Sequence, residues 1–116
     1  MPLHVQLMSD WRRTWSDVSR RHIAAKDSQG AIVELFKLYA ELDLDERAAA
    51  NEDLFEAIRA GDDLERYDAL AITNKFELAD AMPNLRELAV RLQLDESPGA
   101  PFELAKVQRL IEKLQT

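Results

Sequence analysis

The sequence predicts an all-α protein of about six helices, stacked as antiparallel helical hairpins. Apolar residues recur three and four positions apart along nearly the whole chain, and sustained alternation of apolar and polar residues is rare. The 116 residues include only three glycines and four prolines, most of which stand where helices should begin or end. The links between consecutive helices are short, which favours antiparallel neighbours.

The first helix is predicted over Ser9–Ala25, where Ser9 or Asp10 can cap the start. Its inward stripe consists of Trp11, Trp15, Val18 and His22. Residues 1–26 carry a net charge of +3, whereas the other 90 residues carry −10. Tryptophans mixed with arginines also occur in helices that bind nucleic acid or membrane surfaces. Because the rest of the chain would repel a polyanion, we expect the tryptophans to anchor this helix on the core, with no nucleic acid and no membrane as partner.

Two further helices follow the first, each after a short polar turn. The turn 27–30 leads into a helix over Ala31–Leu42, and the next helix covers Asp45–Ala60. Gly61 comes directly after that helix, at a position where glycine commonly takes the left-handed conformation that ends a helix. We therefore expect Gly61 to be a helix-terminating residue.

The fourth helix, Asp63–Phe76, is apolar around most of its circumference, which predicts burial between neighbouring helices. The fifth begins near Pro83 and the last near Pro101, because proline suits the first turn of a helix. No change of composition marks a domain boundary, so a single all-helical domain is predicted over residues 1–116.

Carboxylates are concentrated in residues 41–68, which we call the acidic block. It holds eleven of the 22 acidic residues against three arginines, a net charge of −8 in a chain whose total is −7. Such a field attracts basic partners and repels nucleic acid. Some of these carboxylates stand at predicted helix starts, where the helix dipole favours them in any case. The candidate partner-binding residues are Glu52, Asp53, Glu56, Asp62, Asp63 and Glu65, with Phe55 and Tyr67 as anchors if they are exposed.

The sequence favours no catalytic or metal site. It contains no cysteine, and its two histidines, His4 and His22, are not spaced as a zinc pair on a helix. Residues 43–45 begin like a calcium loop, but the glycine and the final glutamate of such a loop are not at the required positions. No serine stands in a strand-turn-helix setting, and the glycines are isolated, so neither a nucleophile nor a phosphate loop is predicted. We expect no catalytic residue, no metal and no cofactor.

No targeting or membrane segment is expected. Residues 1–8 lack the basic segment and the long apolar core of a signal peptide. No apolar run approaches the roughly 20 residues that cross a bilayer. Together with the absence of cysteine, this favours a cytoplasmic location.

Residues 64–92 form a two-helix motif with small and large apolar residues in the first helix and a proline at the start of the second. The residues that carry the motif are Arg66-Tyr67-Asp68-Ala69-Leu70, Glu77-Leu78-Ala79-Asp80-Ala81-Met82-Pro83 and Leu85-Arg86-Glu87-Leu88. This stretch, about a quarter of the chain, resembles a HEAT-like helical repeat, although the turn lacks glycine. The resemblance implies a short right-handed solenoid or bundle in which each unit buries its apolar face against a neighbour.

The segment Pro98–Glu103 leads into a terminal helix, and the whole chain is small, acidic and helical. In these respects it resembles small all-helical bacterial proteins, some of them similar to immunity proteins encoded beside polymorphic toxins. The resemblance includes no motif whose residues can be transferred. It implies a cognate toxin, nuclease-like, as the basic partner.

The sequence thus predicts a non-catalytic protein-binding module whose acidic helical face binds a basic protein. In a narrower form, it is an immunity protein that neutralises a bacterial toxin. Two alternatives stay open: a scaffold or regulatory subunit that uses the same face, and an unrecognised enzyme with a carboxylate pocket. The basic first helix of one copy could also meet the acidic block of another, which would give a homodimer.

Overall fold

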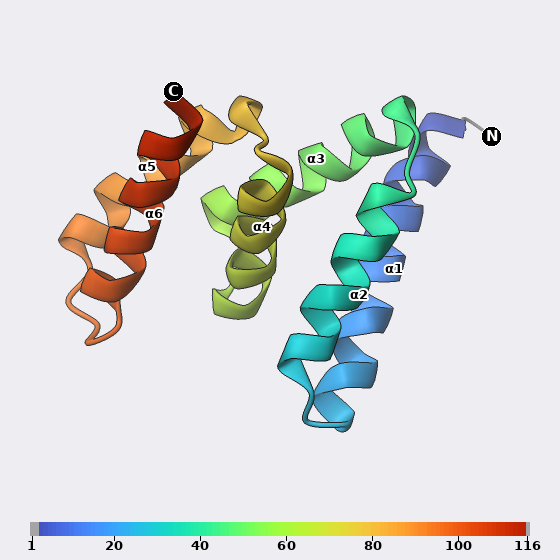
Figure 1. Ribbon diagram of the computed structural model, residues 1–116, viewed down its shortest axis with the longest axis horizontal. Coiled ribbons are helices and arrows are strands. Elements are labelled where there is room, and N and C mark those ends of the chain that lie inside the picture. The colour runs from blue at the N-terminus through green and yellow to red at the C-terminus, as the bar shows by residue number, and fades with distance from the viewer. Residues whose placement is uncertain (1–2, 116) are drawn as a thin grey trace. The chain divides into compact units, whose positions relative to one another are not determined.

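Helices make up nearly all of the chain (Figure 1). The computed structural model describes the backbone of residues 3–115 and the side chains of residues 10–27 and 29–115. Over these residues there are six α-helices, one 3-10 helix and no strand, so the all-α prediction is confirmed. The elements are α1 (Leu3–Ala24), α2 (Ser28–Ala40), α3 (Leu44–Ala60), α4 (Asp63–Phe76), η1 (Ala79–Ala81), α5 (Met82–Leu94) and α6 (Ala100–Gln115).

The first two helices begin earlier than predicted. The predicted caps Ser9 and Asp10 lie inside α1, because no glycine or proline between residues 3 and 24 interrupts the helix. Helix α2 starts at Ser28 and not at Ala31, because Asp27 caps it: its Oδ1 accepts a hydrogen bond from the backbone N–H of Gly30 at 3.0 Å. A Cβ atom at Gly30 would lie 2.1 Å from the other carboxylate oxygen of Asp27, so glycine makes room for the cap.

Helix α3 ends at Ala60, directly before Gly61 as predicted, but Gly61 does not take the left-handed conformation. None of the glycines has a positive φ, and the backbone N–H of Gly61 bonds to the carbonyl of Ala57 at 2.8 Å, as in a continuing helix. A Cβ atom here would lie 2.6 Å from that carbonyl oxygen, so close backbone approach is the reason for glycine. The left-handed positions are instead Lys26 after α1 and Glu77 after α4.

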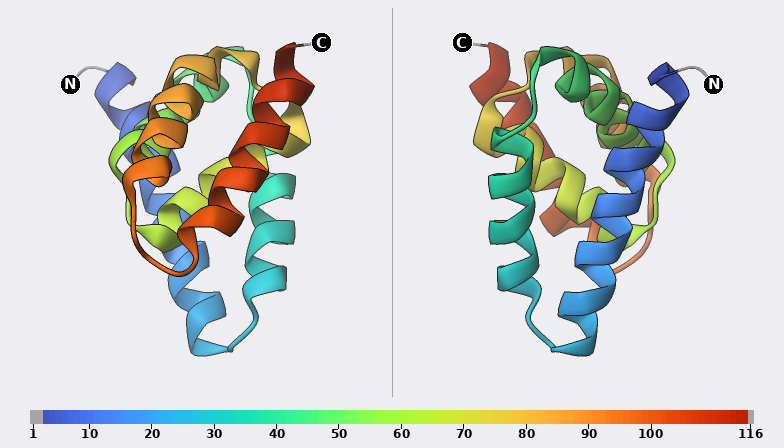
Figure 2. Two further views of the ribbon diagram at one scale, coloured as in Figure 1. Left: turned by 90° about the vertical axis from the view of Figure 1, so that its left-hand side faces the viewer. Right: turned by 90° about the vertical axis from the view of Figure 1, so that its right-hand side faces the viewer.

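The chain divides inside α3 into two compact units, Met1–Leu54 and Phe55–Thr116. In the first unit, α1 and α2 form an antiparallel hairpin (Figure 2). Trp11 and Trp15 are 4% and 3% exposed, which confirms that they anchor α1 on the core. The ring of Trp11 meets that of Tyr39 edge-on, and the Tyr39 hydroxyl donates to Asn51 Oδ1 at 2.7 Å, which joins α2 to α3.

Polar contacts between charged side chains connect α1 and α2 near the turn of this hairpin. Arg21 Nη2 on α1 donates to one oxygen of Glu34 on α2 at 2.8 Å, and His22 Nε2 lies 2.8 Å from the other. These hydrogen bonds, that of Arg21 first, lower the pKa of Glu34. A carboxylate with a lowered pKa in the folded state stabilises the fold above its unfolded pKa, and this contribution disappears as the pH falls through the folded value.

We therefore expect Glu34→Gln to destabilise the hairpin near neutral pH. The difference in free energy of unfolding between the variant and the wild type should become smaller as the pH falls from about 5 to about 3. Urea unfolding followed by tryptophan fluorescence measures this, because both tryptophans lie in the hairpin. Glu112→Gln, at an exposed position of α6, is the control. A difference in free energy of unfolding that stays constant over this pH range would contradict a stabilising role of the contacts that Glu34 makes with Arg21 and His22.

In the second unit, α5 and α6 pack as an antiparallel hairpin around Leu85, Leu88 and Val107, each at most 1% exposed. Helices α4 and α6 run in the same direction. Arg66 bonds to Glu103 near their starts and Asn74 to Lys113 near their ends, so residue numbers increase together along both helices. Helix α5 is therefore antiparallel to both α4 and α6.

Helix α4 is less buried than predicted. Ala69, Ile72 and Thr73 are buried, but Leu64 and Tyr67 are 65% and 58% exposed. The apolar residues on one side of α4 therefore pack inside the unit, whereas those on another side lie at the surface.

Candidate functional site

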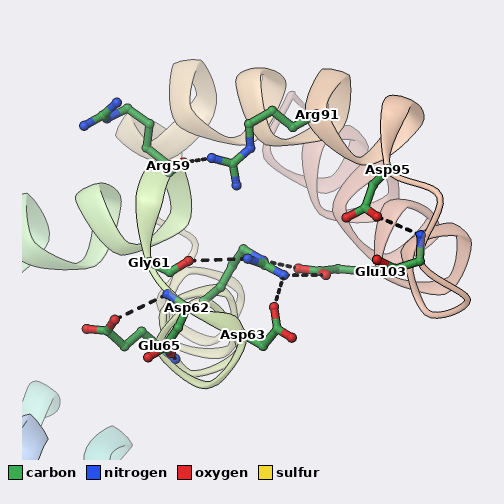
Figure 3. A network of polar contacts seen from close by, with 10 residues as sticks. Arg59, Gly61, Asp62, Asp63, Glu65, Arg91, Asp95 and Glu103 are labelled. Atoms are coloured by element: carbon green, nitrogen blue, oxygen red, sulfur yellow. Dashed lines mark hydrogen bonds and ion pairs between the residues drawn. The ribbon is translucent and has the colours of Figure 1, made fainter.

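Three of the six predicted partner-binding residues meet at the start of α4: Asp62, Asp63 and Glu65 (Figure 3). Asp62 and Glu65 form a capping box, in which each carboxylate accepts the backbone N–H of the other, at 2.8 Å for Glu65 N–H and 3.4 Å for Asp62 N–H. The side chain of Asp63 is 95% exposed. The start of α4 is therefore rigid, and Asp63 is its most accessible carboxylate.

Arg66 connects this acidic start to α6. Its Nε and Nη2 donate to the two oxygens of Glu103 at 2.5 and 2.9 Å, and Nη2 also donates to Asp63 at 2.8 Å. The bond to Glu103 is the main cause of a raised pKa of Arg66, so its charge persists. Sequence reasoning missed this contact because 37 residues separate Arg66 from Glu103.

A further carboxylate, Asp95, lies near Glu103 in Figure 3. It accepts the backbone N–H of Ser97 at 2.8 Å, and hydrogen bonds with Ser97 lower the pKa of Asp95. The charge of Arg66 lowers it further. The starts of α4 and α6 therefore lie in one region of net negative charge.

A groove of about 630 Å³ runs between α4 and α6. Its apolar lining consists of Leu70, Ala71, Val107 and Leu110. Tyr67 and Phe102, 58% and 74% exposed, also line the groove, together with Glu103 at the acidic end. Toward the C-terminal end of α6 its lining becomes basic, with Lys106, Arg109 and Lys113. We call this feature the α4–α6 groove.

The other three predicted residues lie on α3. Asp53 pairs with Arg12 at 3.8 Å and its side chain is 15% exposed; burial raises the pKa of Asp53, and its Oδ2 is buried with no hydrogen-bond partner among the described residues. Glu56 is held by Arg59 of the same helix. Glu52 is exposed.

The six residues therefore do not form one equivalent set. Asp62, Asp63 and Glu65 are brought together, and Glu56 belongs to the same unit as these three. Glu52 and Asp53 belong to the other unit. Of the predicted anchors, Tyr67 is exposed, whereas Phe55 is half-buried. Phe102 was not among the predicted anchors; the available signal was its spacing to Lys106 and Arg109, which places it on the polar face of α6.

Two further properties concern the described residues as a whole. They include no group of three or more histidines or carboxylates placed to hold a metal ion. None of their helices combines the length and apolar character that crossing a bilayer requires.

Comparison with known proteins identifies no relative. No family model, no curated protein and no solved structure matches the chain.

Proposed function

We propose that the protein is a non-catalytic protein-binding module that holds a basic partner at the acidic starts of α4 and α6. The main support is the exposure of Tyr67 and Phe102 beside Glu103 and the Arg66-linked Asp63. Exposed aromatic side chains within a charged rim are typical of the few residues that dominate binding energy. The carboxylates around them would steer a basic surface toward the aromatics and raise the association rate.

The predicted carboxylates contribute unequally to this proposal. Asp63 is the most available, since Asp62 and Glu65 also hold the helix start and Glu56 is shared with Arg59. Glu52 and Asp53 belong to the other unit and are left out of the proposed site.

The enzyme alternative has less support. Acid–base catalysis by carboxylates needs two such groups in one pocket, with pKa values displaced from each other. The α4–α6 groove is lined by a single carboxylate, Glu103, which is bound by Arg66. A scaffold or regulatory subunit would use the same face and differ only in its partner.

Charge reversal tests the proposal. Affinity capture from the native organism, quantified by mass spectrometry, would compare the wild type with the variant Glu56→Lys and Asp63→Lys. Glu52 and Asp53 are left unchanged because they belong to the other unit. We expect a basic protein to be captured by the wild type and its yield to fall at least tenfold with the variant, because rim carboxylates govern association.

A matched control carries Asp80→Lys and Glu112→Lys, at exposed positions of the same unit outside the predicted set. It changes the net charge by the same amount and should capture the partner like the wild type. Capture that survives the first variant, or that both variants lose equally, would contradict the proposed face.

The narrower proposal is an immunity protein that neutralises a toxin, for which the acidic face would cover a basic substrate groove. If so, the captured protein is toxic when expressed alone, and co-expression of the wild type, but not of the Glu56 and Asp63 variant, restores growth. Growth that is unaffected by the captured protein alone would favour the scaffold or regulatory subunit.

A further inference from the structure

The α4–α6 groove is bounded by a polar contact at each end. Arg66 and Glu103 close the end near the helix starts, and Lys113 closes the other by donating to the backbone carbonyl and Oδ1 of Asn74 at 3.0 and 2.7 Å. Eight residues of α4 and ten of α6 separate these contacts, which corresponds to about 12–15 Å at 1.5 Å per residue. The groove has the length of two to three turns of a helix.

Its lining has the pattern that a third helix fits. On α4, Tyr67 and Ala71 are four residues apart, and on α6, Phe102, Lys106 and Arg109 are three or four apart, as in the ridges of two helices that run in the same direction. Val107 and Leu110 are only 1% and 7% exposed, so the accessible apolar lining comes mainly from Leu70, Ala71 and the two aromatic rings. The space between such ridges accepts residues three and four apart on another helix. Helix α5 contributes no residue to the lining, so it leaves this side uncovered. The described residues also offer no strand to which an extended peptide could add.

The charge of the groove changes sign along its length. At the end near the helix starts the groove is lined by Glu103, whose two oxygens Arg66 binds, and the carboxylates Asp62, Asp63 and Glu65 lie beyond it at the start of α4. Lys106 follows Glu103 by one turn of α6, and Arg109 and Lys113 line the far part of the groove; Lys106 and Arg109 are exposed. A complementary occupant is therefore basic at the first end and acidic at the second.

This polarity also defines a direction. Basic residues stabilise the C-terminal end of a helix and acidic residues its N-terminal end, through the helix dipole. A helix whose basic C-terminal end lies at Asp63 and whose acidic N-terminal end lies at Arg109 and Lys113 runs opposite to α4 and α6. With α4, α5 and α6 it would complete four helices of alternating direction, a packing common in helical bundles.

We propose that the α4–α6 groove binds an amphipathic helix of the partner, two to three turns long and antiparallel to α4 and α6. This inference rests on the proposed function, and it adds the secondary structure, the order of charges and the direction of the bound segment. Apolar side chains at positions i, i+3 or i+4, and i+7 would contact the apolar lining and the rings of Tyr67 and Phe102.

Selection from a display library of 16-residue helix-forming peptides against the whole protein tests this inference. The selected peptides should share the apolar spacing, with Asp or Glu toward the N-terminus and Lys or Arg toward the C-terminus. A synthetic peptide of this class is then compared by fluorescence anisotropy with a second peptide in which the two charged ends are exchanged. The exchange should weaken binding at least tenfold.

Variants of the groove complete the test. Ala71→Glu places a charge in the apolar lining, and Phe102→Ala removes an exposed ring at little risk to folding; each should weaken the selected peptide at least tenfold. Val90→Glu introduces the same charge at a 57% exposed position of α5 and should leave the affinity unchanged. Circular dichroism of all three variants verifies that the helices remain folded.

Several outcomes would overturn the inference: no binder selected, binders insensitive to both groove variants, or binders with the opposite charge order. A dimer by light scattering that Ala71→Glu dissociates would show that a second copy occupies the groove. Partner capture separates this inference from the proposed function. If Ala71→Glu still captures the basic partner, the groove inference fails while the acidic face stands; if charge reversal at Glu56 and Asp63 leaves capture intact, the acidic face fails instead.

Discussion

Replacing Trp15 by alanine is expected to lower the free energy of unfolding by about 3–5 kcal/mol, the usual range for a buried tryptophan. Its side chain is 3% exposed, its ring centroid lies 6.4 Å from that of Trp11, and Arg12 covers its face at 5.1 Å. The substitution removes these contacts and leaves a cavity between α1 and its neighbours. A domain of this size is stable by only about 5–15 kcal/mol, so the variant should be close to unfolding at 37 °C.

Urea unfolding followed by circular dichroism measures this loss. Ile23→Ala is the matched control, because Ile23 lies on the same helix and is 61% exposed; it should change the stability by less than about 0.5 kcal/mol. A loss below about 1 kcal/mol for Trp15→Ala would mean that α1 does not depend on its tryptophans for docking.

The second large effect is expected in the other unit, where Leu85→Ala should cost about 2–5 kcal/mol. Leu85 is fully buried on the inner side of α5. Both tryptophans lie in Met1–Leu54, so fluorescence reports that unit, whereas circular dichroism reports the helices of both. If residues 1–116 form the predicted single domain, the two signals should shift to lower urea together, as two-state unfolding requires.

Leu94→Ala, at an 80% exposed position at the end of the same helix, is the control and should leave both transitions in place. A fluorescence transition that stays unchanged while the dichroism transition splits would contradict the single domain. It would show that Met1–Leu54 unfolds independently of the rest.

The helix starts show how far local sequence reaches. The patterns Asp43-x-x-Glu46 and Asp62-x-x-Glu65 both form capping boxes, with carboxylates bonded to each other's backbone N–H groups. Sequence reasoning explained Asp43 and Asp62 as helix-start residues but left Glu65 as an unexplained acidic residue. The spacing of three residues was the available signal for its role.

Contacts between residues far apart in the sequence could not be predicted from such local patterns. Asp53 and Glu56 were both predicted as partner-binding residues. The pairing of Glu56 with Arg59 of the same helix is local and could have been read from the sequence. Asp53, however, lies 3.8 Å from Arg12, which is far from it in the sequence. The pairing of Arg66 with Glu103 likewise depends on the packing of α6 beside α4. A local pattern does not specify which distant arginine reaches a carboxylate, because this depends on how whole helices pack.

The sequence by itself determined the helical class and the approximate place of each helix, and it favoured, without deciding, that Trp11 and Trp15 anchor the first helix. These properties follow from apolar periodicity and turn chemistry, which act over a few residues. Only the tertiary structure decided which carboxylates remain accessible, and only it formed the α4–α6 groove with Tyr67 and Phe102 in its lining. The groove needs residues more than 30 positions apart to meet, and the packing of α4, α5 and α6 that brings them together is a property of the folded chain.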